Sequence, residues 1–189
     1  MSALLTKDQH GFGINHQKRA KLRNMKVFVL DNSLRESTVA QTAGHTLANK
    51  VEILKQIEKC GFENVIVAAF GGLSDSDRRV DDAFCENLVN YCSQASMANA
   101  WTYAFSEVSD SINTKDGKMA WGEENIPAGM QKIRRYGISS AIIEIDVEYT
   151  KTVPVSVVID ALKFLLTWAN THLQPLKNTD DRYRHMVNL

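Results

Sequence analysis

The sequence is poor in cysteine, in net charge and in long apolar runs, and each absence excludes a class of protein. Its 189 residues include three cysteines, Cys60, Cys85 and Cys92, and none of them lies in a CxxC pair of the kind that binds zinc. An odd number of cysteines without such spacing is typical of proteins from a reducing compartment, where thiols stay unpaired, so we expect a cytoplasmic location. The 22 basic residues balance the 22 acidic ones, which argues against a dedicated nucleic-acid-binding domain.

We expect neither a membrane-spanning segment nor a secretory signal in this sequence. No apolar run approaches the roughly 20 residues that a bilayer crossing requires. Residues 1–5 are too few for the apolar core of a secretory signal. Residues 1–25 carry five basic side chains against one acidic side chain and show no sustained apolar period. They predict a flexible basic leader, with a targeting signal as the alternative, ahead of one folded domain over residues 26–189.

Within residues 26–189, short apolar runs alternate with segments of helical periodicity. The runs are typical of strands buried on both faces, and they are Val27–Leu30, Val65–Phe70, Ala98–Phe105, Ala141–Ile145 and Arg184–Leu189. The helical segments between them cover residues 47–60, 80–92, 125–136 and 154–169. This alternation predicts an α/β fold with parallel strands and helices packed on the sheet. The spacing fits a doubly wound sheet or a partial (β/α)8 barrel, and by itself does not choose between them.

Polar residues follow the predicted strands at the edge where both of these folds bind ligands. The first strand ends in Asp31-Asn32-Ser33-Leu34-Arg35-Glu36, in which two carboxylates flank an arginine. Carboxylate oxygens suit Mg²⁺ or Mn²⁺, and an arginine can bind a substrate carboxylate or stabilise an oxyanion. Asp146 follows the fourth strand and is expected at the same edge. The alternative interpretation is a network of ion pairs that holds the loop.

The segment Asp31–Glu36 resembles the strand-one signature D-x-[TS]-L-R-[DE] of the pyruvate carboxyltransferase-like, or HMG-CoA lyase-like, superfamily. The similarity continues over residues 45–53 and 60–67. It implies a TIM barrel, of which residues 26–189 would form about four and a half βα units. Members of this superfamily are metal-dependent lyases, aldolases and acyltransferases. They form or break carbon–carbon bonds in 2-oxo acids or acyl-CoA substrates.

The resemblance also implies roles for particular residues. Arg35 would stabilise the enolate, and Glu36 would bind the divalent metal, which is Mg²⁺ or Mn²⁺, with Zn²⁺ as a further possibility. Asp31 and Asp146 are candidates to contact the substrate or to support the metal ligands. The superfamily completes its metal site with a His-x-His pair, which the five histidines of this sequence do not form. We therefore expect the metal site of this chain to be incomplete, and the chain alone to be incomplete or inactive as an enzyme.

One further expectation follows from the idea of a partial barrel, and two alternatives to it remain. Open strand edges at both ends of the sheet would pair with another chain, so self-association is expected. The alternative from another functional class is a non-catalytic α/β binding or interaction module, in which Arg35 and Glu36 form a structural ion pair. A doubly wound enzyme that uses the carboxylates at its switch point is the third possibility.

Overall fold

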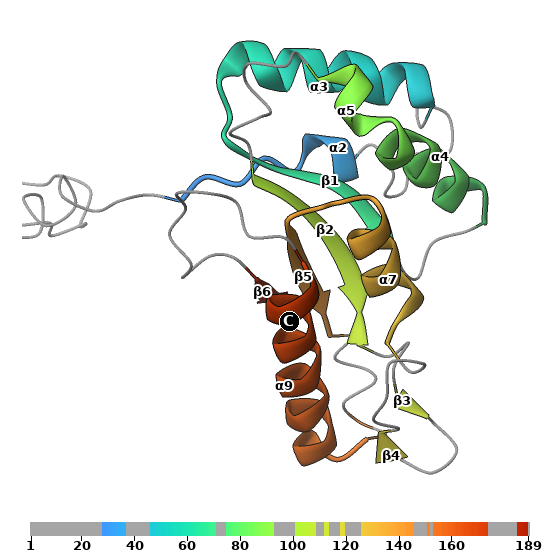
Figure 1. The fold of residues 1–189 in the computed structure, drawn as a ribbon, viewed down its shortest axis with the longest axis vertical. Coiled ribbons are helices and arrows are strands. Elements are labelled where there is room, and N and C mark those ends of the chain that lie inside the picture. Colours follow the sequence, from blue (N-terminus) through green and yellow to red (C-terminus); the bar gives the residue numbers. More distant parts are fainter. Residues whose placement is uncertain are drawn as a thin grey trace, which may run out of the picture.

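The computed structural model describes residues 28–36, 46–70, 75–92, 101–108, 112–113, 118–119, 126–145, 151, 153–173 and 185–188. Within these ranges the fold is α/β, with six helices and a four-stranded parallel sheet (Figure 1). The strands of this sheet are β1 (Asn64–Phe70), β2 (Trp101–Glu107), β5 (Ser140–Glu144) and β6 (Met186–Asn188). Their order across the sheet, β1-β2-β5-β6, is also their order along the chain.

The described helices alternate with these strands along the chain, as the sequence predicts: two precede β1, and the other four lie between successive strands of the sheet. They are α2 (Ser33–Glu36), α3 (Leu47–Cys60), α4 (Asp75–Glu86), α5 (Leu88–Tyr91), α7 (Ala128–Arg135) and α9 (Val155–His172). A two-residue antiparallel pair, β3 (Ile112–Asn113) with β4 (Lys118–Met119), forms a separate small sheet. The predicted α/β class is therefore confirmed. The predicted leader over residues 1–25 lies outside the described residues.

Two predicted elements differ from those observed. The expected first strand is reduced to an extended segment, Phe28–Asp31, which joins the sheet through one parallel bridge between Asp31 and Val65. The expected helix over residues 80–92 is divided at Asn87 into α4 and α5. The Asn87 side-chain amide donates to the Ala83 carbonyl at 3.2 Å. Such side chain–backbone bonds compete with the helical ladder and weaken it locally.

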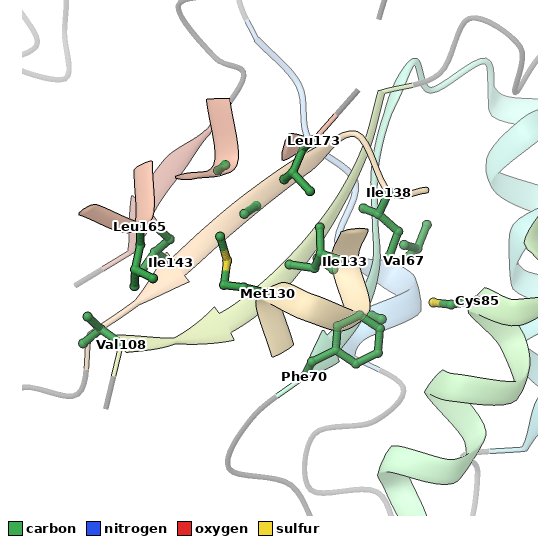
Figure 2. Packing of buried hydrophobic residues seen from close by; sticks show 14 of the residues in the cluster. Val67, Phe70, Cys85, Val108, Met130, Ile133, Ile138, Ile143, Leu165 and Leu173 are labelled. Atoms are coloured by element: carbon green, nitrogen blue, oxygen red, sulfur yellow. The ribbon is translucent and has the colours of Figure 1, made fainter. Parts of the chain in front are cut away.

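The two faces of the parallel sheet are covered differently. On one face, strand residues such as Val67 and Ile143 pack against the helices, and Figure 2 shows Met130 and Ile133 of α7 among them. We call this the helix-side core. The opposite face, here called the inner face, carries a second buried cluster made only of residues from the strands and the adjoining extended segments. Its members are Ile66, Ala69, Tyr103, Phe105 and Ile142, with Phe28, Leu30 and Met186 packed against them.

A buried Lys–Asp pair lies against a bulge in β1. The register of β1 against β2 shifts around Val67, and both Val67 and Ala68 belong to the helix-side core. The Lys50 ammonium donates to the Val67 carbonyl at 2.9 Å and also to the Asp81 carboxylate. The other Asp81 oxygen accepts from the Ala69 N–H at 3.0 Å. Both charged side chains are 0% exposed, so the pair links α3 and α4 to the bulge in the interior.

The long helix α9 packs on the sheet next to β5. It buries Val158, Leu165 and Ala169 in the helix-side core. Its solvent side carries Asp160 and Lys163, which form an exposed ion pair at 3.5 Å. In the part of the chain that the structure describes, neither α9 nor any other helix combines the length and the apolar character needed to cross a bilayer.

Candidate functional site

The turn into α2 begins at Asp31 and is built from local hydrogen bonds. Asp31 Oδ1 accepts the Ser33 N–H at 3.0 Å, and Oδ2 accepts the Ser33 hydroxyl at 3.2 Å. The Asn32 carbonyl then accepts the Arg35 N–H at 3.1 Å. An aspartate that bonds to the backbone two residues ahead forms an Asx turn, so the Asp31 side chain stabilises the start of α2. Leu34 is buried in the helix-side core, which holds the rotation of this short helix.

Arg35 extends across the inner face of the sheet. Its guanidinium lies 4.4 Å from the centre of the Phe105 ring, and its Nη2 lies 3.7 Å from Oε1 of Glu144. Because Phe105 is on β2 and Glu144 is on β5, the Arg35 side chain extends from the edge of the sheet across β1 and β2 toward β5. A charge-assisted hydrogen bond would measure about 2.7–2.9 Å. This contact between Arg35 and Glu144 is therefore mainly Coulombic, and partial exposure of both side chains, 21% and 30%, weakens it.

Glu144 lies in a polar row across the carboxyl ends of three strands. The register of the sheet places Glu107 of β2, Glu144 of β5 and Asn188 of β6 side by side. The Asn188 side-chain amide donates to Glu144 Oε1 at 3.2 Å, the same oxygen that faces Arg35. One cation, one amide and two glutamate side chains thus gather at the edge where α/β proteins bind ligands.

The floor of the inner face is apolar and uncharged. Tyr103 lies two residues before Phe105 on β2, is fully buried, and makes an edge-to-face contact with Phe28 at 6.2 Å between ring centres. Burial raises the pKa of the Tyr103 phenol well above its ordinary range, so the group stays neutral at physiological pH. The charged groups of this region are therefore concentrated at the carboxyl edge, above the apolar floor.

The structure describes the side chains of two of the four predicted site residues, Asp31 and Arg35. Arg35 is at the carboxyl edge, with Glu144 as an ion-pair partner. Both carboxylate oxygens of Asp31 accept hydrogen bonds from Ser33. Glu36 ends α2, but its side chain and the whole of Asp146 lie outside the described residues.

Sequence reasoning missed three residues of this site, Phe105, Glu144 and Asn188. A signal for Glu144 was present, because it is the one charged residue in the apolar run Ala141–Ile145. Strand alternation places it on the same face as Ile142 and thus on the inner face. No comparable signal pointed to Asn188, whose position depends on the pairing of β6 with β5.

The described residues do not fit the divalent metal that the sequence resemblance implies. Mg²⁺ requires near-octahedral coordination by oxygen, and it keeps water where the protein supplies few ligands. Within the described ranges, no three His, Cys, Asp or Glu side chains come together as a metal-binding group. The Glu144 carboxylate is also engaged by Arg35 and Asn188.

Comparison of the chain with known protein families, with curated proteins and with solved structures finds no match. What this site does must therefore be inferred from its own residues and from the signature over Asp31–Glu36.

Proposed function

We propose that the chain is a partial barrel of the pyruvate carboxyltransferase-like type that binds a small carboxylic acid, of the 2-oxo acid class, through Arg35. The strand order supports this architecture, because strands that follow each other in the chain also neighbour each other in the sheet. A doubly wound sheet would reverse its order at a switch point. The inner cluster, which contains no residue from the described helices, supports the same interpretation.

The observation that carries the proposed binding is the position of the Arg35 guanidinium. The guanidinium lies at the carboxyl edge against the Phe105 ring, and its Nη2 is 3.7 Å from Oε1 of Glu144, which is longer than a hydrogen bond. An arginine presents a planar fork that matches a carboxylate in two parallel hydrogen bonds. A ligand carboxylate can make this closer pair, so it competes with Glu144 for the guanidinium. A small acid held mainly by one arginine is expected to bind with a Kd of about 1 mM, or about −4 kcal/mol.

Carbon–carbon chemistry would need more than this site supplies. The divalent metal implied by the resemblance would polarise the oxo group of the substrate, and Glu36 is the residue proposed to hold it. The remaining ligands would have to come from outside the described residues or from another chain. We therefore propose acid binding, and not turnover, as the function of this chain alone. The same proposal places it in the cytoplasm, where Cys60, Cys85 and Cys92 would remain the free thiols that they are here.

An NMR titration with pyruvate tests the proposal, with the neutral amide pyruvamide as the control ligand. Arg35→Gln is expected to weaken pyruvate binding about tenfold or more, since a charge-assisted hydrogen bond contributes about 1.5–3 kcal/mol. Arg35→Lys is expected to have an intermediate effect, because the charge remains while the planar fork is lost. Glu144→Gln is expected to tighten binding by up to about fivefold, because it removes a competing ion pair worth about 0–1 kcal/mol.

Glu86→Gln is the matched control for Glu144→Gln. Glu86 pairs with Arg135 at 3.8 Å, nearly the separation of the Arg35–Glu144 pair, but it lies on α4. It should leave pyruvate binding unchanged. Equal binding of pyruvate and pyruvamide, or unchanged pyruvate binding by a folded Arg35→Gln variant, would contradict the proposal. Repeating the titration with Mn²⁺ shows whether a metal contributes, because a metal bound next to the acid would tighten pyruvate binding.

The second candidate is a non-catalytic interaction module, and the contact between Arg35 and Glu144 favours it. In that case the pair would only join α2 to β5 across the inner face. Glu144→Gln would then lower the free energy of unfolding, by at most about 1 kcal/mol for so exposed a pair. Neither pyruvate nor Mn²⁺ would change the melting temperature. The thermal unfolding curves of the same variants therefore separate the two functions.

A further inference from the structure

The described part of the sheet ends in two strand edges that match each other. At one end, β6 pairs with β5, and the paired residues are Ile142 with Met186, Ile143 with Val187, and Glu144 with Asn188. At the other end, the segment Phe28–Asp31 lies along β1. Every pair in this sheet is parallel, so the two end segments run in the same direction.

The direction of the backbone groups along each edge can be read from the hydrogen bonds. The amide and carbonyl of Asp31 both bond to β1, and the carbonyl of Val29 accepts the Asn64 side chain at 3.1 Å. Residues 29 and 31 therefore face β1, and Leu30 between them faces outward, because backbone groups alternate along a strand. On the other edge, the Asn188 carbonyl accepts the Ile145 N–H. Val187 therefore faces outward from β6 by the same alternation.

The side chains of the two edges also match. Val187 is paired with Ile143, whose side chain belongs to the helix-side core. Asp31 is paired with Val65 of the same core. Val29 lies two residues before Asp31, so its side chain is on the same face. Both valines are thus on the helix-covered face, and they are 40% and 49% exposed. On the inner face, Phe28 and Leu30 of one edge and Met186 of the other all contact the same apolar cluster.

We propose that two copies of this chain associate by pairing β6 of each copy with the segment Phe28–Asp31 of the other. In the register that the outward-facing groups allow, Val187 lies opposite Val29, and the Leu30 N–H donates to the Val187 carbonyl. If the two copies are related by a two-fold axis along the strand direction, this junction occurs twice, and the two sheets together form one closed ring of parallel strands. The partner is a second copy because each edge is complementary to the other edge of the same chain in polarity, register and apolar character.

A pairing of β6 with β6 would be a different arrangement. Two identical edges related by a two-fold axis across the sheet run antiparallel, and they bring each Val187 close to its own copy. That arrangement leaves Val29 out of the interface. Substitutions at Val29 therefore distinguish the proposed junction from the simplest alternative, and the result does not depend on ligand binding at Arg35.

Sedimentation velocity over a range of protein concentrations tests the proposal. The unmodified chain is expected to sediment as a dimer. Val29→Lys or Val187→Glu alone places a charge without a partner in each junction. If each junction weakens about tenfold, the two junctions of the ring together raise the dimer Kd about a hundredfold. The combined variant, with both substitutions, is expected to regain the dimer because the new ammonium and carboxylate face each other across the junction.

Val89 provides the matched control, since it is a valine on α5 that is 84% exposed and distant in the chain from both edges. Val89→Glu and Val89→Lys should leave the dimer unchanged. Circular dichroism establishes that each variant is folded before it is compared. A monomeric unmodified chain, polymers that grow with concentration, or a folded combined variant that remains monomeric would each overturn the proposal. Loss of the dimer in both Val89 variants would also overturn it, because the interface would then lie elsewhere.

Discussion

The buried pair of Lys50 and Asp81 allows the strongest prediction about stability. Lys50→Met keeps the length of the side chain but removes the ammonium that binds the Asp81 carboxylate and the Val67 carbonyl. Removing one partner of a buried ion pair costs about 3–5 kcal/mol, because the remaining charge stays in the interior without its countercharge. The whole free energy of unfolding of a domain is about 5–15 kcal/mol. We therefore expect Lys50→Met to lose a large part of it, measured as a shift of the urea midpoint at constant slope.

Lys132→Met is the control for this substitution. Lys132 pairs with Asp82, the neighbour of Asp81, at 2.7 Å, but both side chains of that pair are 30% exposed. Partly solvated pairs contribute about 0–1 kcal/mol, so the loss of stability should be several times smaller. If the two substitutions cost the same, burial would not be the source of the effect, and the reasoning would be refuted.

The double variant Lys50→Met with Asp81→Leu tests the same reasoning from the other side. Replacing a whole buried pair by apolar residues is often neutral, or stabilising by about 1–4 kcal/mol. The Val67 carbonyl loses its Lys50 partner in both variants, so the double variant additionally loses only the Ala69 N–H bond to Asp81, at about 1–3 kcal/mol, while it removes the buried carboxylate that has lost its countercharge. The double variant should therefore be more stable than Lys50→Met alone. The same urea series measures it, and a double variant less stable than the single one would show that the backbone contacts dominate.

Two further predictions concern packing and thiol reactivity. Gly129→Ala is expected to destabilise the protein by about 1–3 kcal/mol, although alanine favours helices, because the added Cβ would lie 2.4 Å from the Phe70 carbonyl oxygen and 2.6 Å from Ser106 Oγ. A rise in the thermal midpoint would contradict this. Burial raises the pKa of Cys92 to about 11, so its thiol remains protonated at about pH 8 and is a poor nucleophile. Mass spectrometry should find exposed Cys60 alkylated first, and equal rates for the two thiols would contradict the prediction.

Local sequence patterns were sufficient for the α/β class and for several element boundaries. Helix α3 shows the reason, because both of its ends depend on neighbouring residues. The Thr46 hydroxyl accepts the Asn49 N–H at its start, and Gly61 adopts the left-handed conformation, with φ 74°, at its end. The predicted end of this helix at residue 60 is confirmed. The division of the predicted helix over residues 80–92 was missed, because an asparagine in a helical pattern is compatible with either outcome.

The sequence by itself determined that Arg35 follows the first extended segment, at the edge where α/β proteins bind ligands. Only the tertiary structure decided what faces it, because Phe105 and Glu144 reach Arg35 across strands that are distant in the chain. The same holds for Lys50, whose helical periodicity does not distinguish it from a surface lysine. It is buried because Asp81, 31 residues later, meets it at the bulge of β1. Contacts between distant segments depend on packing, and the periodicity of a single segment contains no information about its partner.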